Sequence, residues 1–448
     1  MASLIFCSFA QINPNANHKQ ASTKKNDISF YNSISYHPQR GISKDLHLTH
    51  EDDYMENIKK VRNMLCSGED SFESLVTIDA LQRLGIDYHF EEEIRNILTS
   101  VYNNIGGVHN DKGDVFKKFV NQEGNFELSP KEDVGGMLEL YEASYLNIGE
   151  DILDKAKDFS GQYLKDMMKH SEERQTWEHI SHTLKYPFHT SVIRHHSEYH
   201  LNRYRGGSCM NKALEELASL DLNMVRSLHQ KEVQAVSRWW KDLGLAQELK
   251  FARDEPLKWF MWPMVALPDP RFSRCRIEIT KPIALLYIID DIFDVCGSLD
   301  ELILFTQAIN RWDTTMIDSL PRYMKICYMS LYNITNEIAY YVFKEHGWNP
   351  IGSIQRADEN QDGFDGSYLE YYLKENPNLS SENGRKHVKR MISDAWKGLN
   401  KECFFPEPFS RCFAQANLNG ARMVRVMYDY DGDHRLLDHK KQVDSLRN

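Results

Sequence analysis

Apolar residues recur along most of the chain at the three- and four-residue intervals of an amphipathic helix. Between residues 53 and 65, for example, Tyr54, Ile58, Val61 and Leu65 form one stripe. No alternating pattern typical of β-strands interrupts the series, and no fixed-period repeat occurs. The pattern predicts an all-α chain of stacked helix pairs. The helical pattern is found in residues 53–65, 74–84, 90–101, 136–146, 152–168, 223–240, 299–312, 323–343, 386–400 and 404–428.

One predicted helix, over residues 282–294, joins an apolar run to three carboxylates in the pattern DDxxD. In an α-helix positions i and i+4 share a face, so Asp290 and Asp294 should point together, with Asp291 beside them. Carboxylates late in a helix oppose its dipole, and massed like charges next to buried apolar residues are costly. A divalent cation removes both penalties. Because Mg²⁺ prefers oxygen ligands and takes substrate phosphates as further ligands, the pattern favours a magnesium site; a solvated acidic helix end is the alternative.

Composition narrows the class of protein. A chain of 448 residues predicts two or three domains, and the net charge of −11 argues against nucleic acid as a partner. The eight cysteines are scattered, with no CxxC and no zinc-ligand spacing, which indicates free thiols in a reducing compartment. No apolar run reaches the roughly 18 residues of a membrane span.

Residues 1–45 differ from the rest of the chain. They are rich in Ser, Asn and Lys, and Asp27 and Asp45 are their two acids. The short apolar stretch over residues 4–10 lacks a basic lead-in, so the segment resembles an organellar transit peptide more than a secretory signal. This predicts a chloroplast location, with a disordered N-terminus and a cytoplasmic location as the alternative.

Four segments, taken in order, resemble the signatures of plant class I terpene synthases: residues 75–90, 136–144, 238–244 and 290–294. The resemblance implies an N-terminal α-barrel-like helical domain over residues 46–220 and a C-terminal class I terpenoid synthase α-bundle over residues 221–448. It also implies a lyase that ionises a prenyl diphosphate with the help of Mg²⁺, or alternatively Mn²⁺. A small prenyl diphosphate is then the expected partner, and the oligomeric state stays open.

The resemblance also implies roles for individual residues. Asp290, Asp291 and Asp294 would hold the metal, with Glu359 as the last ligand of a second metal motif, and Asp290 and Asp294 would bind the substrate through it. Arg253 would take the departing diphosphate, a task suited to a guanidinium, although Glu255 stands where the family has a second arginine. Aromatic faces stabilise carbocations, so a set of aromatic side chains are candidate substrate contacts, with core packing as their alternative role. They are Trp259, Phe260, Trp262, Tyr287 and Phe293.

Two sequence features favour an acyclic product. The tandem arginine typical of cyclising monoterpene synthases is absent, since Arg40 lies between Gln39 and Gly41. Residues 255–259 resemble the branch that makes acyclic alcohols such as linalool and nerolidol, in which water captures the allylic cation before ring closure. The resemblance does not fix the choice between geranyl and farnesyl diphosphate. A chain-elongating prenyltransferase would need a second DDxxD, and the sequence contains none.

The second metal motif is mostly missing. Ile351 and Gln355 occupy its first two ligand positions, and Glu359 follows Asp290 by 69 positions, about half the spacing usual in the family. A second short join follows residues 109–114. These joins predict an incomplete catalytic bundle with impaired activity, or a defective paralogue or splice variant that persists as a non-enzymatic helical protein. Residues 358–369 begin like a calcium-binding EF-hand loop, but Leu369 replaces the closing glutamate, which argues against that site.

Overall fold

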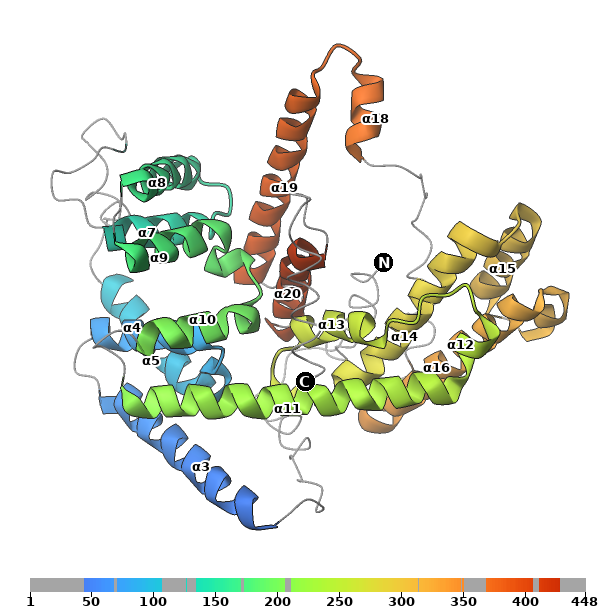
Figure 1. The fold of residues 1–448 in the computed structure, drawn as a ribbon, viewed down its shortest axis with the longest axis horizontal. Coiled ribbons are helices and arrows are strands. Elements are labelled where there is room, and N and C mark those ends of the chain that lie inside the picture. The colour runs from blue at the N-terminus through green and yellow to red at the C-terminus, as the bar shows by residue number, and fades with distance from the viewer. Residues whose placement is uncertain are drawn as a thin grey trace, which may run out of the picture. The chain divides into compact units, whose positions relative to one another are not determined.

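The computed structural model describes residues 44–67, 71–106, 126, 134–170, 173–205, 211–312, 314–347, 349, 368–405 and 411–427. Over these residues the chain folds into helices and their connections, with no strand beyond a single bridge position at Phe126 (Figure 1). The predicted all-α fold is therefore confirmed. None of the described helices combines the length and the apolar character needed to cross a bilayer.

The described helices fall into two compact units. Among the described residues, the N-terminal unit comprises those within 44–224 and 380–405, and the C-terminal unit those within 225–379 and 411–427. The helices of the N-terminal unit are α3 (Lys44–Ser67), α4 (Ser71–Leu84), η1 (Asp87–His89), α5 (Glu91–Gly106), α7 (Val134–Ser144), α8 (Asp151–His170), α9 (Arg174–Lys185), η2 (Phe188–Thr190), α10 (Ile193–Arg205), the start of α11 (Lys212–Leu243) and α19 (Ser381–Phe404). The C-terminal unit holds the rest of α11, α12 (Leu245–Glu248), α13 (Pro256–Ala266), η3 (Pro270–Phe272), α14 (Ser273–Asp291), η4 (Ile292–Cys296), α15 (Leu299–Arg311), η5 (Thr314–Ser319), α16 (Arg322–His346), α18 (Tyr368–Glu375) and α20 (Arg411–Met427).

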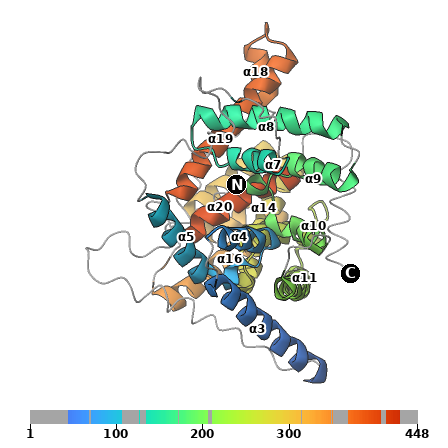
Figure 2. The same cartoon turned by 90° about the vertical axis from the view of Figure 1, so that its left-hand side faces the viewer.

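The N-terminal unit has two apolar cores. In the first, the predicted stripe of Ile58, Val61 and Leu65 on α3 is buried against residues of α4, α10 and α11. The second core lies among α7, α8 and α9, which are neighbours in both views (Figures 1 and 2). Amphipathic helices that each bury one face against a neighbour account for both cores.

Asp221 on α11 is the buried polar centre of the N-terminal unit. Its side chain is fully buried and accepts hydrogen bonds from Arg194 Nη1 at 2.7 Å, from Tyr54 at 3.0 Å and from Tyr88. His89 Nε2 lies 3.3 Å from the same carboxylate. Burial alone would raise the pKa of Asp221, but the hydrogen bonds and the charge of Arg194 lower it to about 2. The carboxylate is therefore charged, satisfied and sealed from solvent.

Helix α19 belongs to the N-terminal unit, although the sequence placed it in the C-terminal domain of residues 221–448. The amide of Asn400, which is 1% exposed, donates to the carbonyls of Tyr145 and Asn147, both at 2.9 Å. Its Oδ1 lies 2.8 Å from His189 Nε2, and Lys397 pairs with Asp154 at 2.7 Å. A buried amide needs such partners, so these contacts hold α19 to its neighbours in the N-terminal unit, while the domain bounds expected from the family resemblance stay a prediction.

The C-terminal unit is organised around α13, which is apolar on nearly every side. Eight of its residues are buried, and the helix packs against α14 and α20. A helix without a polar face has to lie inside its unit. A second fixed point is the fully buried Arg276, whose Nη2 and Nε contact the carboxylate of Glu232 at 2.6 and 2.9 Å. This paired charge joins α14 to α11.

Candidate metal-binding site

The aspartate motif lies where α14 ends. Its apolar lead-in is buried, as the pattern predicted, through Ile283, Leu285 and Ile288. Asp290 and Asp291 close the α-helix, and a five-residue π-helical turn over Ile292–Cys296 follows, fastened by the Gly297 N–H to the carbonyl of Ile292 at 2.8 Å. This turn contains Asp294. The motif is therefore divided between two kinds of helix.

The π-helical turn changes how the three carboxylates are presented. An i→i+5 turn holds more residues than an α-helical turn, so α-helical spacing no longer sets the direction of Asp294 relative to Asp290. Asp290 is half-exposed, Asp291 is buried and Asp294 is exposed. Within the described ranges no three His, Cys, Asp or Glu side chains are gathered so that they could hold a metal ion. The three aspartates do not form such a group as they stand in the described residues, and their assignment as ligands stays a prediction.

Arg253 binds the end of α14 through both its main chain and its side chain. Its backbone N–H donates to Oδ2 of Asp291 at 2.8 Å, and its Nη2 donates to Oδ2 of Asp290 at 2.5 Å. Nε lies 2.6 Å from Oδ1 of Asp291, in an ion pair whose angle does not suit a hydrogen bond. Nη2 also donates to the carbonyl of Tyr287 at 3.3 Å, and the guanidinium lies 4.9 Å from the centre of the Tyr287 ring. Arg253 thus contacts the aspartate motif directly, a contact that the sequence did not predict, while its role toward a diphosphate stays a prediction.

Charge explains why this contact forms. Partial burial lowers the pKa of Arg253, but the hydrogen bond to Asp290 and the charges of both aspartates outweigh it and leave the pKa raised. The guanidinium therefore stays charged and neutralises part of the carboxylate pair. Sequence reasoning could not find the backbone contact to Asp291, because no residue pattern reports a main-chain N–H.

Four of the predicted aromatic residues lie in or beside α13. Trp259 and Phe260 are fully buried and Trp262 is nearly so, while its Nε1 donates to the hydroxyl of Tyr287 at 3.1 Å. Trp259 packs edge-on against Trp240, with ring centres 4.8 Å apart. Among the described residues its buried Nε1 has no hydrogen-bond partner. The chain of contacts from Arg253 through Tyr287 to these rings places aromatic faces directly behind the motif.

Phe293, the fifth aromatic candidate, is different. It belongs to the π-helical turn, is 44% exposed, and has its ring centre 6.5 Å from that of Phe305 on α15. Phe293 is therefore much more exposed than the three aromatic residues on α13. The five aromatic candidates therefore comprise three buried rings on α13, the partly buried Tyr287 on α14 and the exposed Phe293.

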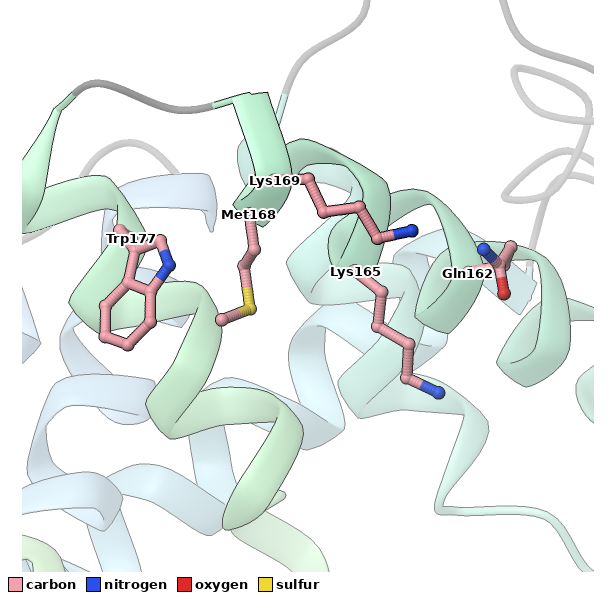
Figure 3. A pocket seen from close by; sticks show the side chains of 5 residues that line it. All are labelled: Gln162, Lys165, Met168, Lys169 and Trp177. Atoms are coloured by element: carbon pink, nitrogen blue, oxygen red, sulfur yellow. The ribbon is translucent and has the colours of Figure 1, made fainter.

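A surface hollow lies in the N-terminal unit and contains none of the predicted site residues. Figure 3 shows Trp177 on α9 beside Met168 on α8, with Lys165, Lys169 and Gln162 extending from α8. Lys169 is paired with Asp166 at 2.8 Å, and Trp177 is 43% exposed. The hollow is thus lined by surface side chains without a buried polar group to orient a ligand.

The donors at the end of α14 fit a divalent cation in their chemistry. They are carboxylate oxygens, the ligands that Mg²⁺ prefers, and a cationic group already stands against two of them in the form of the Arg253 guanidinium. Glu359 and the neighbouring Ile351 and Gln355 lie outside the described residues. The described part of the site is therefore a carboxylate pair with an internal counter-ion, plus one exposed aspartate.

Comparison with known proteins adds a second line of evidence. Residues 241–357 match the model described as "Terpene synthase family, metal binding domain", and residues 31–113 and 108–184 match "Terpene synthase, N-terminal domain". A probable terpene synthase 4 of Ricinus communis is 39% identical, with 84% of this chain and 86% of the relative covered. The (E)-nerolidol synthase TPS18VF of Cannabis sativa is 33% identical over the whole of both chains. The chloroplastic S-(+)-linalool synthase of Arabidopsis thaliana is 33% identical, with 88% of this chain and 89% of the relative covered.

A solved structure has the same fold. The crystal structure of isoprene synthase from grey poplar, in complex with three Mg²⁺ ions and dimethylallyl-S-thiolodiphosphate, gives a TM-score of 0.78 at 28% identity. The match covers 89% of this chain and 96% of that one.

The alignments also bear on the predicted internal gaps. The alignment to the Cannabis sativa relative has 562 positions, and 562 minus the 448 residues of this chain leaves at least 114 positions opposite gaps in it. This chain therefore lacks internal segments that the relative carries.

Proposed function

The chain belongs to the terpene synthase family, whose members are lyases acting on prenyl diphosphates, and from this premise we propose that it is a magnesium-dependent synthase of an acyclic terpene alcohol. The observation that carries the proposal is the direct contact of Arg253 with the aspartate motif. It brings an anion-binding guanidinium to the carboxylates that suit a divalent cation.

Each group has a task in this proposal. Asp290 and Asp294 would hold the metal, because their side chains are the solvent-accessible carboxylates of the motif. Asp291 is buried and accepts a hydrogen bond from the backbone N–H of Arg253, which would keep the guanidinium at the site for a bound diphosphate. A bound Mg²⁺ would supply Lewis-acid neutralisation of the departing diphosphate, which eases heterolysis of the allylic C–O bond. The isoprene synthase complex with Mg²⁺ and a diphosphate analogue supports this ligand chemistry.

The aromatic group behind the motif would contact the hydrocarbon chain. Trp259 and Trp262 are buried and Tyr287 lies beside them, and the π-faces of these rings would favour a delocalised cation. We assign Trp259 as the substrate-binding residue of this group. Glu359 remains our proposal for a further metal ligand from the second motif.

The product and the location rest on the relatives. An (E)-nerolidol synthase and an S-(+)-linalool synthase are among them, which supports release of an acyclic alcohol from farnesyl or geranyl diphosphate. Several relatives are named chloroplastic, which supports a chloroplast location. A chloroplast location would in turn favour geranyl diphosphate as the substrate.

A second candidate function is a catalytically impaired family member that persists as a helical protein. The specific observation in its favour is the loss of internal sequence, with Ile351 and Gln355 in ligand positions of the second motif. Such a protein would keep the fold of both units but bind the metal weakly.

One experiment separates the two candidates. The purified protein is incubated with geranyl or farnesyl diphosphate and Mg²⁺, Mn²⁺ or EDTA, and the volatile products are identified by gas chromatography and mass spectrometry. If the protein is an active synthase, linalool or nerolidol should form with Mg²⁺ or Mn²⁺, and its formation should stop when EDTA is added. If a folded sample with metal gives the same chromatogram as the EDTA control, the protein is the catalytically impaired family member.

A further inference from the structure

Arg253 is bound to the metal motif at several points at once. The backbone N–H and Nε contact the buried Asp291, while Nη2 reaches past it to the half-exposed Asp290 at 2.5 Å. The carbonyl and ring of Tyr287 support the guanidinium from the side. The guanidinium thus occupies an oxygen of the very carboxylate that is open to a ligand.

The two parts of this contact differ in how easily they can be broken. The contacts to Asp291 are shielded, since that side chain is 9% exposed, and one of them uses the main chain. The contact to Asp290 joins side chains that are 34% and 45% exposed, so solvent weakens it. Arg253 can therefore release Asp290 by rotating the end of its side chain while its backbone stays anchored on Asp291.

Electrostatics makes Arg253 and a metal ion competitors for Asp290. A guanidinium and a divalent cation on the same carboxylate repel each other, because like charges a few ångströms apart interact strongly outside bulk water. A diphosphate resolves the conflict, since its oxygens accept the bidentate hydrogen bonds of a guanidinium. The arginine then gains a new partner at the moment when the metal gains the carboxylate.

We propose that Arg253 is an internal counter-ion that keeps the metal off Asp290 until a diphosphate arrives, so that metal and diphosphate bind with positive coupling. This inference rests on the proposed function, since it concerns the regulation of the same site. Coupling of this kind is reciprocal: the diphosphate tightens metal binding by the factor by which the metal tightens diphosphate binding.

The test measures Mn²⁺ binding by electron paramagnetic resonance, with and without inorganic pyrophosphate, on the full chain. It compares the wild type with Arg253→Gln and with the control Arg322→Gln. Arg322 is 81% exposed and pairs with Glu248 at 2.9 Å, so the control removes the same charge from an ion pair outside the site.

The expected signature is a reversal of sign. Without pyrophosphate, Arg253→Gln binds Mn²⁺ about tenfold more tightly than the wild type, because the competitor is gone. With pyrophosphate, the same variant binds Mn²⁺ about tenfold more weakly, because the anion has lost its arginine. The control variant follows the wild type in both conditions. A residue that only stabilises the fold would not change sign with pyrophosphate.

Two results would overturn the inference, and they are distinguishable. If the wild type binds Mn²⁺ and Arg253→Gln binds it no more tightly without pyrophosphate, the counter-ion role is wrong while the proposed function stands. If neither the wild type nor any variant binds Mn²⁺, both fail. Circular dichroism reports folding, and if Arg253→Gln does not fold, Arg253→Lys decides. Lysine has a smaller cationic head group than arginine, so the Arg253→Lys variant should bind Mn²⁺ more tightly than the wild type without pyrophosphate. Equal Mn²⁺ binding by this variant and the wild type overturns the inference.

Discussion

Two aspartate–arginine centres, one in each unit, use the same residue types for different ends. Asp221 is fully buried, and its oxygens accept hydrogen bonds from Arg194, Tyr54 and Tyr88. The centre of Arg253 and Asp290 has one buried anchor and one carboxylate open to solvent. An ion pair whose partners are all buried has no exposed oxygen to offer to a ligand. A pair with an exposed carboxylate still has an oxygen to offer to a ligand, which makes it the candidate for chemistry.

The largest effect is expected when the solvent-exposed carboxylate of Asp290 is removed, because the two centres then no longer differ in what they offer to a ligand. Asp290→Ala should lower product formation by about 100-fold or more, since transition-state charge stabilisation by a positioned group is worth that much. Thermal stability should change by less than about 1 kcal/mol, because the ion pair is exposed. Gas chromatography of the products and a melting curve measure the two effects. Asp318→Ala, at a fully exposed aspartate, is the control and should leave both unchanged.

Removal of the sealed carboxylate should have the opposite profile. Asp221→Ala leaves Arg194 buried without its partner, so the free energy of unfolding should fall by about 3–5 kcal/mol. Urea denaturation measures this loss. Mn²⁺ binding by the fraction that remains folded should match the wild type. A loss of metal affinity without a loss of stability would contradict the division of roles.

Acid sharpens the same contrast. The folded-state pKa of Asp221 is lowered to about 2, below its ordinary value near 3.8. Its charge therefore contributes stability that is complete above about pH 4 and is lost as the pH falls toward 2, amounting to about 2 kcal/mol. The difference in unfolding free energy between the wild type and Asp221→Asn should shrink over that interval. A difference that stays constant between pH 5 and pH 2 would show that the charge is not what stabilises the centre.

The smallest expected effect compares two indole donors near the open centre. Trp240 donates to Asp254 at 2.8 Å, whereas the buried Nε1 of Trp259 has no partner among the described residues. Both substitutions to Phe remove similar apolar volume, but only Trp240→Phe breaks a hydrogen bond. Trp259→Phe should therefore lower the free energy of unfolding by about 1–2 kcal/mol less than Trp240→Phe does, as measured by urea denaturation. Equal costs would indicate that the Trp259 N–H is satisfied in solution.

The local part of this architecture could be predicted from the sequence. Periodic apolar positions such as Ile58, Val61 and Leu65 report which face of a helix is buried, and the family signatures located the aspartate motif. The π-helical turn was not foreseen, because the spacing of Asp290 and Asp294 suits an unbroken α-helix equally well.

The long-range part could not be predicted. Arg253 meets Asp290 across 37 positions, and Asn400 reaches Asn147 across 253. Such contacts depend on tertiary packing, which helical periodicity does not encode. The family resemblance placed Arg253 near the motif, but it gave no sign that the arginine would bind the carboxylates themselves.

The path of the chain through its two units limits how the protein can be dissected. After residue 379 the chain enters the N-terminal unit for α19, and from residue 406 it is again part of the C-terminal unit for α20. A fragment that starts at residue 225 would carry α19 without the carbonyls that bind Asn400, and a fragment that stops at residue 224 would lose that helix. No single cut in the chain yields two complete units. The protein therefore has to be expressed, exchanged or recombined as a whole polypeptide.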